Sequence, residues 1–108
     1  MADWDRADGR APNFFRNASS GRPLYAWYPQ PEMWAKTYEM LSCVDGLVEH
    51  ARVTGSRRSL ETARAVRDNL ARHEVNSIGG LGISDRLLGA ETFPFASTEL
   101  CDVIHWIR

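Results

Sequence analysis

The sequence has little cysteine, no surplus of either charge and no long apolar run. Its two cysteines cannot form a disulfide framework, which favours a reducing compartment. With 13 basic and 14 acidic residues, the net charge is −1, and the basic surplus that contacts with nucleic-acid phosphates require is missing. No run of about 18 apolar residues is present to cross a membrane. Nucleic acid and membrane are therefore not expected partners.

A targeting signal is also missing at the N-terminus. Residues 1–6 are acidic where a secretory signal is basic, and no apolar run follows them. A cytoplasmic location is the resulting expectation. The remaining composition, 44% apolar and 25% charged in 108 residues, is that of one small globular domain at most.

The first 31 residues combine prolines and glycines with six aromatic side chains. Proline removes a backbone donor and disfavours helix in the preceding residue, so this N-terminal segment is predicted to be irregular. A solvated tail rarely holds so many aromatics. We therefore expect residues 1–31 to pack on the rest of the chain, with a short helix near 11–18.

Two helices are predicted over residues 32–54 and 59–74, because their apolar residues recur at three- and four-residue steps. Pro31 suits the first turn of the former helix, and Gly55 suits its C-terminal stop. Ser56 or Ser59 can cap the second helix. The short connection between them predicts an antiparallel hairpin. The apolar positions of the two helices are Trp34, Tyr38, Leu41, Val44, Val48 and Ala51, and Leu60, Ala63, Val66 and Leu70.

Residues 75–96 are predicted to be a glycine-rich loop, followed by a third helix that begins near Ser97. Leu100, Val103 or Ile104, and Ile107 mark the apolar face of this helix. The sequence stops within it, as a piece of a larger protein would. The fold class expected from these patterns is all-α, with residues 32–108 forming part of a larger domain and an exposed apolar patch above ~600 Å².

The Gly79–Gly82 loop lacks the sequence context of a phosphate-binding loop, because no strand precedes it and no Lys-Ser/Thr pair follows. Backbone freedom in a tight turn is its simpler interpretation. His50 and His73 are expected to be surface or hairpin-packing residues. The aromatic residues of 25–34 could stack on sugar rings, but packing against the protein is the expected use.

Three residues near the third helix carry potential chemistry. Glu99 and Cys101 lie at its start, where a thiolate is stabilised and soft metals bind. Side chains two residues apart point ~200° apart on a regular helix, so only a frayed first turn brings both to one metal. Cys101 and His105 share a face and are an alternative pair. Glu91 lies near Phe93 and Phe95, surroundings that raise a carboxyl pKa toward that of a general acid.

The order of these motifs resembles the β-L-arabinofuranosidase-type glycoside hydrolases, family 127 and its relatives. The matching segments are WAKTYEML from Trp34, the hairpin turn VTGS and LETA from Leu60, then the glycine loop, Gly89-Ala90-Glu91 and Thr98-Glu99-Leu100-Cys101. The resemblance covers residues 32–108. It implies one hairpin and a third helix of an (α/α)6 toroid.

The resemblance further implies retaining hydrolysis of a glycosidic bond, with a carbohydrate as substrate. Glu91 matches the acid/base, although its separation from Glu99 is shorter than in that family. Glu99 and Cys101 match two zinc ligands, and the cysteine nucleophile and remaining ligands are implied to follow Arg108. Cys43 matches no ligand and is expected in the core. The other toroid helices are the implied partners, and no hydrolysis by these 108 residues alone is expected.

Two other functions are compatible with the sequence. One is a non-catalytic helical-hairpin interaction module, although no second copy of the hairpin is present. The other is a fragment of a different (α/α)6 sugar enzyme, such as an epimerase, for which the Glu-x-Cys pair is not expected. If the hydrolase interpretation holds, Glu91, Glu99 and Cys101 lie on one side of the helical layer.

Overall fold

The computed structural model describes residues 13–28, 35–82, 85–90 and 97–108. Within these ranges the regular structure is helical, which confirms the all-α prediction. The elements are α1 (Phe14–Ser20), the 3-10 turn η2 (Leu24–Trp27), α3 (Thr37–Thr54), α4 (Arg57–His73) and α5 (Leu100–Ile107). Isolated β-bridges pair Lys36 with Arg86 and Val75 with Leu81, and the described residues contain no strand.

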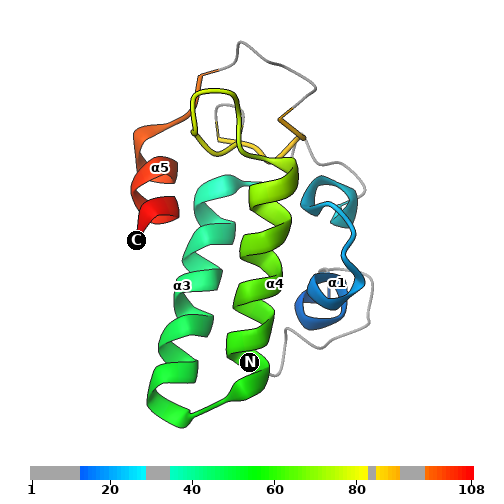
Figure 1. The fold of residues 1–108 in the computed structure, drawn as a ribbon, viewed down its shortest axis with the longest axis vertical. Helices are drawn as coiled ribbons and strands as arrows, with labels where there is room; N and C mark the ends of the chain where they lie inside the picture. The colour runs from blue at the N-terminus through cyan, green and yellow to red at the C-terminus, as the bar shows by residue number, and fades with distance from the viewer. Residues whose placement is uncertain (1–12, 29–34, 83–84, 91–96) are drawn as a thin grey trace.

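The predicted hairpin is present as α3 and α4, which run antiparallel at the centre of the molecule (Figure 1). Gly55 ends α3 in the left-handed conformation at φ 71°, and its N–H donates to the Ala51 carbonyl at 2.8 Å. Ser56 begins α4 by accepting from the Ser59 N–H at 3.3 Å. Of the two candidate caps, Ser56 is therefore the one that begins the helix.

On either side of this hairpin lies one shorter helix, α5 beside α3 and α1 beside α4 (Figure 1). The core is apolar and extends from the N-terminal segment through both hairpin helices into the loop after α4. Its buried members are Phe14, Phe15, Ala18, Leu24, Trp27, Ala35, Met40, Leu41, Leu47, Ala63, Val66, Leu70, Leu81 and Leu87.

The described part of the N-terminal segment, residues 13–28, packs on α4, as its aromatic content predicted. Phe14 contacts Trp27 edge to face at 5.6 Å, and both side chains are buried. Asn69 of α4 accepts from the Leu24 N–H at 3.2 Å and donates to the Arg22 carbonyl at 2.7 Å. The expected short helix is α1, which Asn13 caps by accepting from the Arg16 N–H at 2.9 Å.

The first long helix begins at Thr37, so the predicted helical start is wrong at residues 35–36. The Lys36 carbonyl accepts from the Met40 N–H at 3.1 Å as the N-cap of α3, but the backbone groups on either side of it bond to a distant segment. The Leu87 N–H donates to the Ala35 carbonyl at 2.8 Å, and the Thr37 N–H donates to the Asp85 carbonyl at 2.9 Å. Lys36 also forms a 2.8 Å ion pair with Asp85. Pro31 and Trp34 lie outside the described residues.

The other two helices also begin elsewhere than predicted. α4 starts two residues earlier, at Arg57, because Ser56 is its cap. α5 starts at Leu100, because Glu99 is an extended N-cap residue with φ −73° and ψ 143°. The predicted apolar face of this third helix is exposed at Leu100, Ile104 and Ile107. No helix within the described ranges combines the length and the apolarity needed to cross a membrane.

Candidate functional site

The side chain of Asn76 makes three hydrogen bonds in and next to the glycine-rich loop. Its Oδ1 accepts from the N–H groups of Ile78 at 3.1 Å and of Gly80 at 2.9 Å. Its Nδ2 donates to Thr98 Oγ1 at 2.8 Å, just before α5. The loop is therefore tied to the segment that carries Glu99 and Cys101.

The glycines of this loop allow close packing. A Cβ on Gly80 would lie 2.6 Å from Thr98 Oγ1, and one on Gly82 would lie 2.7 Å from Thr37 Oγ1. Gly82 is also at φ 73°, in the left-handed region that glycine tolerates best. These contacts support the interpretation of the loop as a tight turn.

Glu99 and Cys101 are brought together at the start of α5. Glu99 Oε2 and Cys101 Sγ lie 3.4 Å apart, with Glu99 exposed and Cys101 half-buried. Regular helical geometry would separate these side chains, but the extended conformation of the N-cap turns Glu99 back toward Cys101. With Zn–S near 2.3 Å and Zn–O near 2.0 Å, two ligands of a tetrahedral zinc lie about 3.5 Å apart. The spacing fits two ligands of one ion.

Cys101 is not prone to form a thiolate, contrary to the expectation from its helix position. Desolvation raises its pKa, as do the hydrogen bond to Glu99 and the charge of Asp102. Desolvation and the two neighbouring carboxylates together outweigh the backbone hydrogen bond at the helix start, which lowers the pKa. Metal binding to this thiol must release its proton, so such binding becomes tighter as pH rises.

Asp102 is a second carboxylate at this position, and sequence analysis missed it. Its side chain is fully buried, and Oδ1 lies 3.8 Å from Cys101 Sγ. Its Oδ2 has no hydrogen-bond partner within the described part of the chain. Burial and the nearby Glu99 raise the pKa of Asp102 to about 6. The signal that could have found it is an aspartate inside the mostly apolar sequence of α5.

Because Asp102 is buried and its Oδ2 has no partner among the described residues, a cation near this side chain would offset the buried negative charge. The ligand set is nevertheless incomplete here. Among the residues that the structure describes, no group of three or more His, Cys, Asp or Glu side chains is arranged to hold a metal. Glu91 lies outside the described residues.

The alternative pair, Cys101 and His105, gains no support. His105 Nδ1 lies 2.9 Å from Asp45 Oδ2 on α3, and its ring meets Tyr38 edge to face at 4.9 Å. His105 therefore joins α5 to α3.

His50 and Cys43 have structural surroundings, as predicted. His50 Nδ1 lies 3.0 Å from Ser59 Oγ and links the two hairpin helices. Cys43 is half-buried against the core, and burial followed by the charge of Glu39 raises its pKa.

Glu74, at the end of α4, is a second buried carboxylate that sequence analysis missed. Its Oε2 accepts from the Gly89 N–H at 2.9 Å, and its backbone carbonyl accepts from the Gly82 N–H at 3.1 Å. Desolvation raises the pKa of Glu74 to about 7, although the Gly89 and Leu88 N–H groups oppose that shift. A negative charge at a helix C-terminus is destabilised by the helix dipole. An acidic residue at the end of a predicted helix is therefore the sequence feature that could have identified Glu74.

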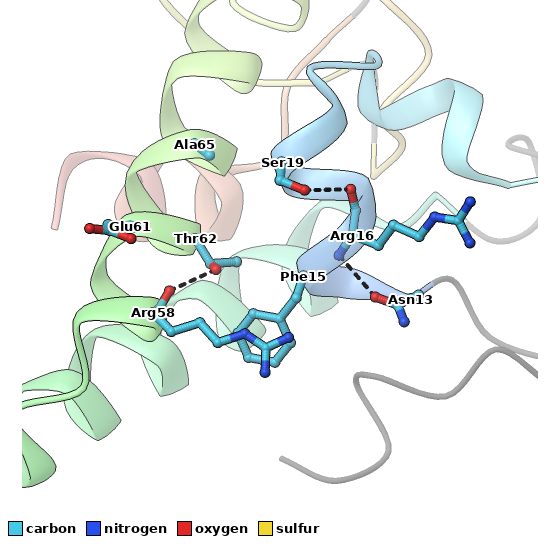
Figure 2. Close-up of a pocket in the computed structure, with 8 residues that line it drawn as sticks. All are labelled: Asn13, Phe15, Arg16, Ser19, Arg58, Glu61, Thr62 and Ala65. Atoms are coloured by element: carbon cyan, nitrogen blue, oxygen red, sulfur yellow. Dashed lines mark hydrogen bonds between the residues drawn. The ribbon is translucent and has the colours of Figure 1, made fainter.

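A separate cavity of about 520 Å³ lies between α1 and α4 (Figure 2). Arg58 stacks over the buried Phe15 ring at 4.0 Å. The hydroxyl groups at its wall donate to their own helices, Thr62 to the Arg58 carbonyl at 2.8 Å and Ser19 to the Arg16 carbonyl at 2.9 Å. It shares no lining residue with the Glu99–Cys101 pair, and these hydroxyl protons are not available to a ligand.

Comparisons with protein families, with curated proteins and with solved structures find no match to this chain.

Proposed function

We propose that this chain forms part of a retaining glycoside hydrolase similar to the zinc- and cysteine-dependent β-L-arabinofuranosidases, within an (α/α)6 toroid. The observation that carries the proposal is the 3.4 Å separation of Glu99 Oε2 and Cys101 Sγ. It agrees with the spacing of two ligands on one tetrahedral ion. The nearby Asp102 oxygen without a partner among the described residues also supports a cation there.

In this proposal each of the three residues has a separate role. Glu99 and Cys101 hold zinc, which when bound stabilises a cysteine nucleophile as thiolate. Glu91 protonates the leaving oxygen of the glycosidic bond and then takes a proton from the water that releases the sugar. No residue of this chain is assigned as the nucleophile.

The loop contacts give the proposal a structural basis. Asn76 joins the glycine loop to Thr98, next to the two proposed ligands. Glu74 bonds to Gly89, two residues before Glu91. These two hydrogen bonds fix described parts of the loop to residues next to α4 and α5, which supports a loop of defined shape before the proposed ligands.

Zinc binding tests the first half of the proposal. We expect the complete protein that contains this sequence to bind Zn²⁺ in competition with a chromophoric chelator, and Cys101→Ser or Glu99→Gln to weaken this binding at least about tenfold. Cys43→Ser is the matched control, since it removes a thiol outside the site and should leave zinc affinity unchanged. Equal affinity of the wild type and Cys101→Ser would contradict the metal assignment.

Turnover tests the second half, in the complete protein that contains this sequence. With an aryl β-L-arabinofuranoside as substrate, Glu91→Gln should abolish most turnover and leave zinc content unchanged, because it removes a proton donor and no ligand. Cys101→Ser should lose both turnover and bound zinc. Intact turnover in Glu91→Gln would refute the acid/base assignment alone.

A non-catalytic interaction module is the second candidate. The observation in its favour is the exposure of apolar side chains on α5, where Leu100 is 74% and Ile107 is 75% exposed. If neither zinc nor turnover is found in the complete protein, this second candidate replaces the hydrolase.

A further inference from the structure

A groove of about 260 Å³ runs between α4 and α5 over the surface of α3. Its floor is apolar and includes Leu41, Val44 and Leu70, and Trp106 of α5 forms part of its wall. Val48 and Leu60 line it as well and are 43% and 37% exposed. The groove therefore offers apolar surface contributed by three helices.

The charged residues at this groove are predominantly basic. Arg64 and Arg67 come from α4, and Arg108 follows α5. Asp45 is the acidic residue that lines it, and it is already paired with His105 at 2.9 Å and with Arg108 at 3.9 Å. Arg67 pairs with its sequence neighbour Asp68, at an exposed position. Arg67 is thus balanced by Asp68, whereas Arg64 has no ion pair among the described residues and leaves positive charge along this wall of the groove.

We propose that this groove binds an amphipathic helix whose apolar stripe is flanked by acidic residues. Apolar side chains at i, i+3, i+4 and i+7 of such a helix would cover the floor between α4 and α5. Carboxylates beside that stripe would meet Arg64 and Arg67 on one wall and Arg108 on the other. Charge complementarity thus selects an acidic partner.

A second copy of this chain is a poorer occupant of the groove. A two-fold dimer through this face would place the same patch on both sides of the interface. Both halves of the interface would then carry an excess of arginine over aspartate, and like charges at an interface oppose association. This inference goes beyond the proposed hydrolase function and uses none of its residues, so either can fail without the other.

The test uses two synthetic helical peptides with the same leucine stripe, one with glutamate and one with lysine beside it, each carrying a fluorophore. Fluorescence anisotropy with the full chain should show binding of the glutamate peptide, at least about tenfold tighter than of the lysine peptide, and weaker as salt increases. Equal binding of the two peptides, or no binding of either, would overturn the proposal.

Charge-reversal variants locate the binding surface. Arg64→Glu with Arg67→Glu should raise the Kd of the glutamate peptide at least about tenfold, and should improve binding of the lysine peptide. Arg72→Glu makes the same kind of charge change in an exposed residue of α4 that does not line the groove, and should leave Kd unchanged. An equal loss in both variants would show that only net charge matters and would refute the groove.

An apolar variant keeps the proposal testable if the charge reversals unfold. Val48→Ser removes an exposed apolar side chain from the edge of the groove and should raise Kd severalfold with an unchanged helical circular dichroism spectrum. An unchanged Kd would contradict the proposal. Sedimentation tests a second copy of the chain as the competing occupant. Two results together would assign the groove to a second copy: the chain forms a dimer that Arg64→Glu with Arg67→Glu strengthens, and the glutamate peptide does not dissociate that dimer.

Discussion

The Glu74 carboxylate accepts a hydrogen bond from the Gly89 N–H at 2.9 Å, so the end of α4 is joined to a residue fifteen positions further along the chain. The adjacent His73 carbonyl also accepts from the Ala90 N–H, at 2.8 Å. A single buried acid therefore helps to close the loop that follows α4. Because the acid is buried, its protonation state is coupled to folding.

Stability is expected to fall as pH rises from 4.5 to about 7. The folded-state pKa of Glu74, about 7, lies above its ordinary value of 4.5. The folded state therefore holds more protons than the unfolded state between these values, and its advantage is lost as pH rises through 7. The full effect is about 3 kcal/mol in the free energy of unfolding. Urea unfolding at a series of pH values measures it.

Glu74→Gln is the variant that isolates this effect. The amide keeps an acceptor for the Gly89 N–H but cannot ionise, so the loss of stability between pH 4.5 and 7 should shrink. Asp102, whose pKa is also raised, should leave a smaller slope of the same sign. A slope identical to that of the wild type would show that Glu74 is not its source.

Asn69→Ala should destabilise the chain by about 1–3 kcal/mol. The substitution removes the acceptor of the Leu24 N–H and the donor to the Arg22 carbonyl, in a part of the structure where Leu24 is fully buried. Thermal unfolding followed by circular dichroism measures the loss. Asp68→Ala, at the neighbouring exposed position of the same helix, should change stability by less than about 0.5 kcal/mol.

Gly82→Ala should destabilise the loop more than Gly79→Ala does. Both glycines have positive φ, but a Cβ at Gly82 would also lie 2.9 Å from the Arg86 carbonyl oxygen, whereas Gly79 has open space around it. Left-handed strain alone costs about 1 kcal/mol, which is the change expected for Gly79→Ala. If the two variants unfold at the same urea concentration, the close packing at Gly82 is refuted.

Gly46→Ala should stabilise the chain by about 0.5–1 kcal/mol. Gly46 lies in the interior of α3 and is exposed, and a methyl group at this position would meet no other atom within 4 Å. Alanine therefore adds helix propensity without a clash. Thermal unfolding measures the gain. A lower melting temperature would contradict the open space around Gly46 and would mean that other atoms cover this face of α3.

Helix faces could be predicted from the sequence, whereas contacts between distant segments could not. The periodicity of Leu41, Ala63 and Leu70 is local information, and these residues are buried as predicted. The start of α3 depends on Asp85 and Leu87, which bond to residues 35–37 from almost fifty positions away. No local pattern carries that information.

The candidate site also has one part that could be predicted from the sequence and one part that could not. The Glu99–Cys101 spacing is visible in the sequence, but their 3.4 Å approach depends on the extended N-cap conformation of Glu99. The buried states of Glu74 and Asp102 result from tertiary packing and change the local electrostatics. The burial of these two carboxylates cannot be predicted from helical periodicity.

The two-residue connection at Gly55 and Ser56 has a consequence for the order of folding. Contacts near this turn join residues close in sequence, so little chain entropy opposes their formation, and the α3–α4 hairpin should form before the other helices dock. α1 and α5 contact this hairpin from opposite ends of the chain and should attach later. Amide hydrogens of Leu47 and Val66 should then gain protection in refolding pulses before those of Ala18 and His105.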